Sequence, residues 1–207
     1  MYLNLLQPML RKNTLYLFCA DLRLPTTEDT SILLPKELIR YQQLPFTKKA
    51  SYLSSRYHIQ SALSTLSITS SLYYEGKRPL LKGPHSISIT HSNNLLIIGI
   101  MEAQSLGIDL QLSPPKDPEL LKKKLQLPPT LPVGKLLSHW VLAEATFKCF
   151  QHPFNQCLKK PMEIILENNG YYKTYHSPPF AAVSTQAIKH IIMSDPKKHI
   201  SDWKTEL

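Results

Sequence analysis

The stretch that organises this chain runs from residue 87 to residue 148. Its segments are ISITHS (residues 87–92), LLIIGIMEA (95–103), LGIDLQ (106–111) and WVLAEATFK (140–148). The first three are short apolar runs, which favour strands, and the last carries apolar residues at helical spacing. Polar residues stand near the ends of these elements. We therefore expect short connections to bring two carboxylates, Asp109 and Glu144, to one place.

Composition describes an ordinary globular chain with an excess of positive charge. The 207 residues are 43% hydrophobic and 19% charged, with a formal net charge of +9. This length allows one sizeable core or two small lobes. The charge would attract nucleic acid, a phosphorylated cofactor or an acidic protein. Against nucleic acid, the lysines are dispersed and the sequence has no zinc-finger or RNP-type motif.

Cysteine content and apolar runs indicate where the protein resides. No apolar run approaches the ~20 residues needed to span a bilayer, and residues 1–13 lack the charge and apolar core of a signal peptide. Cys19, Cys149 and Cys157 form no CxxC pair and are odd in number. This pattern indicates reduced thiols rather than a disulfide framework or a zinc site. We expect a cytoplasmic protein that does not associate with membranes.

The first half of the chain predicts a strand followed by two helices. Residues 15–22 are apolar and aromatic, which favours a strand. Residues 36–43 and 47–66 carry apolar residues at helical spacing. Three basic residues toward the start of the second helix do not complement the helix dipole, so they form either a solvated face or an anion contact. These residues are Lys48, Lys49 and Arg56.

Strands and turns are predicted next. Gly-Lys-Arg-Pro at 76–79 has the composition of a turn. Residues 87–90 and 95–101 predict a hairpin through the turn-prone Ser92-Asn93-Asn94. Because residues 106–110 follow almost at once, the three runs together predict an antiparallel meander.

The second half repeats this plan. Residues 113–134 are proline-rich and predict a connector with one short helix near 119–125. Residues 135–150 predict a long helix, and the remaining chain predicts four strands with an Asn-Asn-Gly hairpin turn at 168–170. These strands are expected at residues 162–166, 171–175, 180–184 and 189–193.

We expect an α+β fold of two similar lobes, residues 1–105 and 106–207, related by a pseudo-twofold axis. Each lobe would have antiparallel strands and a long helix, and a ligand site would lie between the lobes.

Each candidate site residue has a structural explanation when taken alone. An aspartate at the end of a buried strand, such as Asp109, is usually a turn or cap residue. Glu144 and Lys148 are four apart on a helix, where a surface ion pair would contribute about 0.3–0.5 kcal/mol. Trp140 lies one turn earlier on nearly the same face, which indicates that this face is partly covered. His91, at a strand end, is most simply a structural histidine.

The order of the motifs changes this judgement. GKRP (76–79), THS (90–92), GIDLQ (107–111) and WVLAEATFK (140–148) resemble the series GKP, SHS, G-I/V-D-x-E and W-x-x-K-E-x-x-x-K of the 4'-phosphopantetheinyl transferases. The likeness covers roughly residues 48–148 and is greatest to the large monomeric type that acts on peptide and fatty-acid synthases. It implies magnesium-dependent transfer of 4'-phosphopantetheine from coenzyme A to a serine of an acidic acyl or peptidyl carrier protein, with release of 3',5'-ADP.

The resemblance also implies residue roles. Asp109, Glu144 and Gln111 would hold magnesium, which prefers hard oxygen ligands. Asp109, Glu144 and Lys148 would be catalytic: Glu144, or a water that it orients, would take the serine proton, and Lys148 would stabilise a phosphate or the leaving group. The residues that would bind coenzyme A are Lys48, Lys49, Arg56, Lys77, Arg78, Pro79, His91 and Ser92.

Within that set, Lys77 and Pro79 would border the adenine, whereas His91 and Arg56 would meet the 3'-phosphate. Lys48 and Lys49 would add phosphate contacts.

Three departures from the family pattern keep a second hypothesis open. Gln111 stands where an acid is expected, Ala143 replaces the lysine before Glu144, and Arg78 is inserted in the GKP motif. The connector between Asp109 and Glu144 is also shorter than expected. The alternatives are an active transferase and a degenerate member that binds coenzyme A or a carrier protein without transfer. A nucleic-acid-binding module rests on charge alone.

Overall fold

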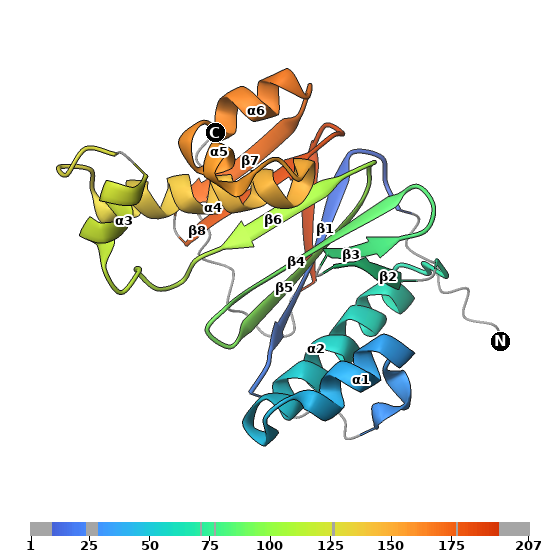
Figure 1. The fold of residues 1–207 in the computed structure, drawn as a ribbon. Helices are drawn as coiled ribbons and strands as arrows, with labels where there is room; N and C mark the ends of the chain where they lie inside the picture. The colour runs from blue at the N-terminus through green and yellow to red at the C-terminus, as the bar shows by residue number, and fades with distance from the viewer. Residues whose placement is uncertain are drawn as a thin grey trace.

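The computed structural model describes residues 10–23, 29–70, 72–76, 78–125, 127–176 and 178–194 (Figure 1). In these residues, groups of helices separate groups of strands, and the strands form three separate sheets. The fold is therefore mixed α+β, in agreement with the expected class.

The largest sheet has the strand order β4-β5-β1-β9. β1 (Thr14–Asp21), β4 (His85–Ser92) and β5 (Leu95–Glu102) pair antiparallel, and β9 (His190–Ser194) joins β1 in parallel. The predicted strand and hairpin are confirmed. Asn93 turns the hairpin with a φ of 56°, a left-handed conformation that asparagine tolerates.

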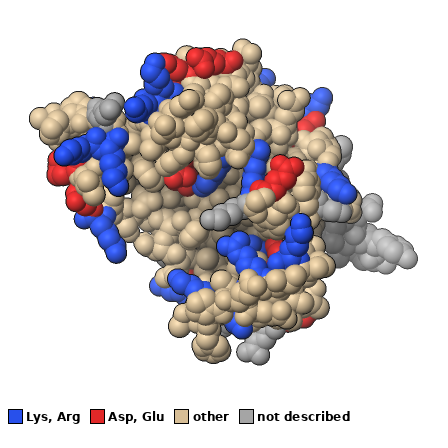
Figure 2. Space-filling view, in the orientation of Figure 1, with Lys and Arg blue, Asp and Glu red and all other residues tan. Residues whose placement is uncertain are grey.

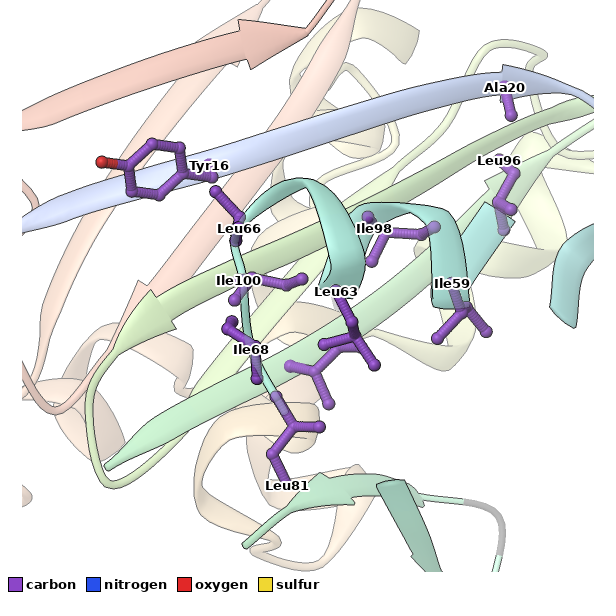
Figure 3. Packing of buried hydrophobic residues seen from close by; sticks show 12 residues of the cluster. Tyr16, Ala20, Ile59, Leu63, Leu66, Ile68, Leu81, Leu96, Ile98 and Ile100 are labelled. Carbon is purple, nitrogen blue, oxygen red and sulfur yellow. The ribbon is translucent and has the colours of Figure 1, made fainter. Parts of the chain in front are cut away.

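Two helices, α1 (Pro35–Gln43) and α2 (Phe46–Thr65), confirm the two helical predictions of the first half. Helix α2 buries Ile59 and Leu63 in a cluster that also contains Ile98 and Ile100 of β5 (Figure 3). Ile59 and Leu63 are one helical turn apart and so lie on one face. This cluster covers one face of the large sheet.

β2 (Leu72–Glu75) and β3 (Arg78–Leu81) form a small sheet of their own. The prediction that residues 76–79 are all turn is wrong, because Arg78 pairs with Glu75 and Pro79 with Tyr74. Gly76, with a φ of 59°, makes the turn. A proline is tolerated here because a two-stranded ribbon leaves outward-facing positions that need no backbone donor.

The third sheet has the order β6-β8-β7 and is antiparallel. Its strands are β6 (Leu106–Leu110), β7 (Tyr171–His176) and β8 (Pro179–Ser184). The predicted meander is wrong, because β6 pairs with β8 instead of continuing from β5. Every residue of β6 is buried, since it lies between the large sheet and α4. In this position β6 is covered on both faces, so it buries more apolar surface than it would as a strand with one face in solvent.

The connector and the second half contain four helices. α3 (Pro118–Lys124) and α4 (Val133–Phe150) confirm two predictions, and α5 (Phe154–Lys159) was not anticipated. Residues 162–166 were predicted as a strand but belong to α6 (Pro161–Glu167). Periodicity cannot separate a short apolar run in a strand from one in a helix; the proline at the first turn was the available signal.

The predicted hairpin turn at 168–170 instead ends α6. The Gly170 amide donates to the carbonyl of Ile165 over 2.7 Å, and Asn169 adopts a φ of 49°. These features are typical of a helix C-terminus.

The large sheet and the third sheet share one core. Leu15, Leu17 and Ile97 of the large sheet pack with Ile108 and Phe180 of the third. The chain passes from one sheet to the other at residues 103–105, close to the predicted boundary between lobes, although β9 returns to the large sheet. Across the described ranges, no helix is long and apolar enough to cross a membrane.

Candidate functional site

Gly107 lets α4 lie directly on β6. A Cβ at this position would stand 1.9 Å from the carbonyl oxygen of Ala145 and 2.7 Å from the amide nitrogen of Cys149. Gly107 and Asp109 are two apart and share one face of β6, the face turned to the helix. The glycine therefore brings the aspartate up against the last turns of α4.

Asp109 is bonded on two sides. Its Oδ1 accepts from Lys148 Nζ over 2.7 Å and from Thr90 Oγ1 over 2.8 Å. Lys148 Nζ also donates to the Ile108 carbonyl over 3.0 Å. Asp109 is 7% exposed, so this charge is buried and paired. The structure thus brings together β4, β6 and α4 at one carboxylate.

Glu144 lies one turn before Lys148 on α4 and is half-buried. Burial raises the pKa of its carboxyl, the negative charge of Asp109 raises it further, and Lys148 opposes the shift. In the described part of the chain its oxygens have no hydrogen-bond donor. Asp109 and Glu144 therefore converge, and a negative charge at Glu144 is only partly compensated.

These carboxylates fit a divalent cation that keeps some of its waters. In the described residues no cluster contains three His, Cys, Asp or Glu side chains, so two carboxylates would be the acidic donors. Gln111 Nε2 donates a hydrogen bond to the Ser113 carbonyl over 2.8 Å. Its Oε1 is then available as a neutral oxygen ligand for a metal ion. Magnesium binds in this way, through one or two carboxylates plus water and substrate phosphate oxygens.

A pocket of about 340 Å³ opens beside this cluster, between β3, β4 and the end of α4. We call it the β3–α4 pocket. Its walls combine apolar side chains with two cations, Arg78 and Lys148, and one carboxylate, Glu75. The apolar and cationic parts suit a flat apolar group bearing phosphates, whereas phosphates would have to lie away from Glu75. The lining residues include Arg78, Pro79, Ile87, Ser88, Phe147 and Lys148.

A second pocket, also about 340 Å³, lies between α3 and α4, and we call it the α3–α4 pocket. It is lined in part by Gln111, Leu120, Lys124 and Trp140. The last turn of α3 is basic. Figure 2 shows Lys and Arg side chains around α3 and along α1 and α2 on the same face of the molecule. Positive charge therefore borders this second pocket as well.

Two residues of the predicted coenzyme A set line the β3–α4 pocket. Arg78 donates from Nη2 to Ser105 Oγ over 2.7 Å and approaches the Cys149 carbonyl at 3.5 Å, so it also ties β3 to the end of α4. A cation there complements the helix dipole. Pro79 lies beside it in the wall. Lys77 lies outside the described residues.

His91 and Ser92 end β4 on opposite sides, as neighbours in a strand do. His91 is exposed, whereas Ser92 is buried and its Oγ accepts from the Leu112 amide over 2.9 Å. Ser92 is thus already engaged within the protein.

The basic residues of α2 form a separate group. Arg56 Nε lies 2.6 Å from Glu37 Oε1, and its guanidinium carbon lies 4.3 Å from the Tyr52 ring centre. Lys48 is exposed, and Lys49 Nζ stands 5.2 Å from the Tyr41 ring centre. Within the described ranges none of these cations contacts Asp109 or Lys148.

Thr90 and Gly107 lie within two of the motifs found in the sequence, but no role was predicted for either. Hydroxyl residues at every second position of an apolar strand, Ser88, Thr90 and Ser92, were a signal for Thr90. A glycine inside a strand indicates close approach of another backbone, which was the signal for Gly107.

Comparisons with known proteins add no relative. A scan against protein-family models finds no match to this chain, and a search of curated proteins finds no significant match. Its function is therefore inferred from the site and from the order of its motifs.

Proposed function

We propose that this protein transfers 4'-phosphopantetheine from coenzyme A to a serine of an acyl or peptidyl carrier protein. One observation carries the proposal: Lys148, which bonds to Asp109 and lies one helical turn from Glu144, also lines a pocket with Arg78 and apolar side chains in its walls. Asp109, Glu144 and Lys148 are the residues that the resemblance to the 4'-phosphopantetheinyl transferases marks as catalytic. We propose a monomeric, cytoplasmic enzyme.

The proposal includes a two-lobed fold with a pseudo-twofold relation between residues 1–105 and 106–207. Two features support it. Each half contains an antiparallel sheet, and each has one long helix, α2 and α4, packed near that sheet. Asp109 and Lys148 belong to the second half, whereas Thr90, which also bonds to Asp109, belongs to the first.

In the proposed reaction the serine Oγ attacks the phosphorus that bears the pantetheine. The O–H bond of serine breaks, a new O–P bond forms, and the bond to the second phosphate breaks to release 3',5'-ADP. Glu144 would receive the proton, and its raised pKa brings it closer to the range in which a carboxylate is an effective base. Lys148 would offset charge on the phosphates, since its side chain lines the pocket.

Asp109 and Glu144, with Gln111 Oε1 as a third donor, would hold the magnesium ion. When bound, the ion would neutralise charge on the diphosphate. The nucleotide would occupy the β3–α4 pocket, with Pro79 against the base and Arg78 near phosphate. Further coenzyme A contacts remain predictions for Lys48, Lys49, Arg56, Lys77, His91 and Ser92. For two of these residues the ligand would have to replace a partner within the protein, Glu37 for Arg56 and the Leu112 amide for Ser92.

The proposed partner is an acidic carrier protein. The chain has a formal net charge of +9, and the last turn of α3 carries Lys122, Lys123 and Lys124. Lys122 is paired with Glu119, whereas the next two lysines are exposed beside the α3–α4 pocket. Such a surface attracts an acidic protein at low ionic strength.

A second candidate, a protein that binds coenzyme A or a carrier protein without transfer, is favoured by two observations. Position 143 holds a fully buried alanine where the family pattern has a lysine, so it supplies no positive charge toward the phosphates. Lys148 occupies Asp109 Oδ1, one of the oxygens that a cation would use. Gln111 adds no charge to the donor set.

The test is to incubate the protein with coenzyme A, Mg²⁺ and a panel of apo carrier proteins and to measure intact masses. A gain of one phosphopantetheine that requires both Mg²⁺ and Glu144 supports the transferase. Calorimetry with coenzyme A runs in parallel on the same samples. Binding without any mass gain across the panel would support the second candidate and refute the first.

A further inference from the structure

Three hydroxyl side chains join β4 to β6. Ser88, Thr90 and Ser92 alternate along β4 and are each at most 6% exposed. Side chains two residues apart share one face of a strand, so the three hydroxyls form a row. This row lies toward β6, which has no backbone ladder with β4.

The outer two hydroxyls bond to the backbone of the facing segment. Ser88 Oγ accepts from the Ile108 amide over 3.0 Å, and Ser92 Oγ accepts from the Leu112 amide over 2.9 Å. The middle one differs, because Thr90 Oγ1 donates to the side chain of Asp109 over 2.8 Å. Thus two of the three bonds hold the strand, and one holds the carboxylate.

We infer that Thr90 is a positioning residue that fixes the Asp109 carboxylate in one orientation. Thr90 and Lys148 both donate to Oδ1, which occupies that oxygen from two directions. Oδ2 has no hydrogen-bond donor in the described part of the chain and is left to a ligand. Hydrogen bonds from a second layer of residues set the direction of metal-binding carboxylates in this way.

Thr90 is needed because Lys148 alone cannot define the carboxylate. A lysine ammonium sits on four rotatable carbons and donates in any direction, whereas a β-branched threonine in a strand has a restricted χ1. Thr90 is buried at 4% exposure, so its hydroxyl has no water to replace Asp109. Removing the hydroxyl alone therefore leaves the Asp109 carboxylate bonded only to Lys148, whose Nζ it shares with the Ile108 carbonyl.

The test compares Thr90→Val, which keeps the shape, with Thr90→Ser, which keeps the hydroxyl. Ser86→Ala is the matched control, because it removes another side-chain hydrogen bond of β4, from Ser86 Oγ to the Ala103 carbonyl, that does not touch Asp109. Three-bond couplings to Asp109 Cγ measured by NMR report its χ1 rotamer in the full chain without any ligand. Mn²⁺ titration followed by electron paramagnetic resonance reports the affinity for the metal alone.

We expect Thr90→Val to average the Asp109 χ1 couplings and to weaken Mn²⁺ binding roughly 10- to 100-fold. Thr90→Ser and Ser86→Ala should keep one rotamer and an affinity close to that of the unmodified chain. The inference is overturned if Thr90→Val keeps a single rotamer, or if Ser86→Ala causes the same loss.

The effect on catalysis rests on the proposed function, but the rotamer measurement does not. If the unmodified protein transfers nothing to any carrier protein and Thr90→Val still frees Asp109, the proposed function fails and the positioning role stands. If transfer occurs and the rotamer is unaffected by Thr90→Val, the reverse holds.

Discussion

Replacing Gly107 by alanine should separate α4 from β6 and dismantle the site. The new Cβ would stand 1.9 Å from the Ala145 carbonyl oxygen, whereas ordinary contact begins at 3.4 Å. The neighbour is helix backbone and cannot rotate away, so α4 must retreat by about 1.5 Å. The Lys148 side chain would then have to extend to keep its 2.7 Å bond to Asp109 Oδ1, and the backbone that carries Glu144 would move away from Asp109.

The stability cost follows from the same geometry. Overpacking in a well-packed core costs about 1–3 kcal/mol, and rigid backbone on the opposing side places Gly107→Ala at the upper end. For a chain of this length each kcal/mol lowers the melting temperature by roughly 2–4 °C. We therefore expect a drop of roughly 6–12 °C in a thermal melt, together with loss of any transfer activity.

Gly134→Ala is the matched control, because Gly134 lies in the first turn of the same helix and a Cβ there meets nothing within 4 Å. Alanine in a helix is favoured over glycine by about 1 kcal/mol, so this variant should melt at or slightly above the unmodified protein. If Gly107→Ala melts within a degree of Gly134→Ala and keeps its activity, the close packing of α4 on β6 is not what builds the site.

Three further predictions concern the carboxylates and their neighbour. Glu144→Gln should abolish transfer yet raise stability at pH 7. Because the pKa of Glu144 is raised in the folded state, the unmodified protein loses stability as the pH rises from the ordinary pKa of 4.5 through the folded pKa. Below pH 4.5 the unfolding free energies of the two proteins should converge. Urea unfolding at several pH values measures this, and a difference independent of pH would contradict the assigned cause. Asp109→Ala should eliminate transfer while far-ultraviolet circular dichroism stays unchanged, and normal turnover would remove Asp109 from the catalytic set. Gln111→Glu should lower the Mg²⁺ concentration needed for half-maximal transfer, since it adds a charged donor; an unchanged Mg²⁺ dependence would show that residue 111 does not face the ion.

Local patterns predicted most of the elements that carry the site. The apolar spacing of Ile59 and Leu63 predicted α2, the Asn93-Asn94 turn predicted the β4–β5 hairpin, and Trp140 to Lys148 predicted the end of α4. In each case the signal lies within one element, where periodicity and turn chemistry act over a few residues. The same local patterns predicted that Asp109 ends a strand and that Glu144 and Lys148 share one helix face.

Pairing between distant segments was not predictable. β6 follows β5 closely in the chain but bonds to β8, more than 70 residues later, because burial on both faces decides its position. No local signal distinguishes these partners. The order of the apolar runs alone therefore suggested a meander that does not form.

Side-chain partners were equally hidden. The family resemblance implied that Arg56 meets the 3'-phosphate of coenzyme A; in the structure Arg56 pairs with Glu37 from the preceding helix and lies over the Tyr52 ring. The role of Thr90 depends on its distance to Asp109, which only the packing of β4 beside β6 creates. Residue type indicates what a side chain can bind, and the fold decides what lies within reach.

Crystals grown with coenzyme A and Mn²⁺, measured for anomalous scattering at the manganese edge, would show whether Asp109 and Glu144 hold one metal ion. We predict one strong peak that contacts carboxylate oxygens of both residues at about 2.1 Å, near the distance at which Mg²⁺ binds oxygen, with the diphosphate of coenzyme A on its other side. A nucleotide bound elsewhere, or a metal peak that touches neither carboxylate, would contradict this prediction.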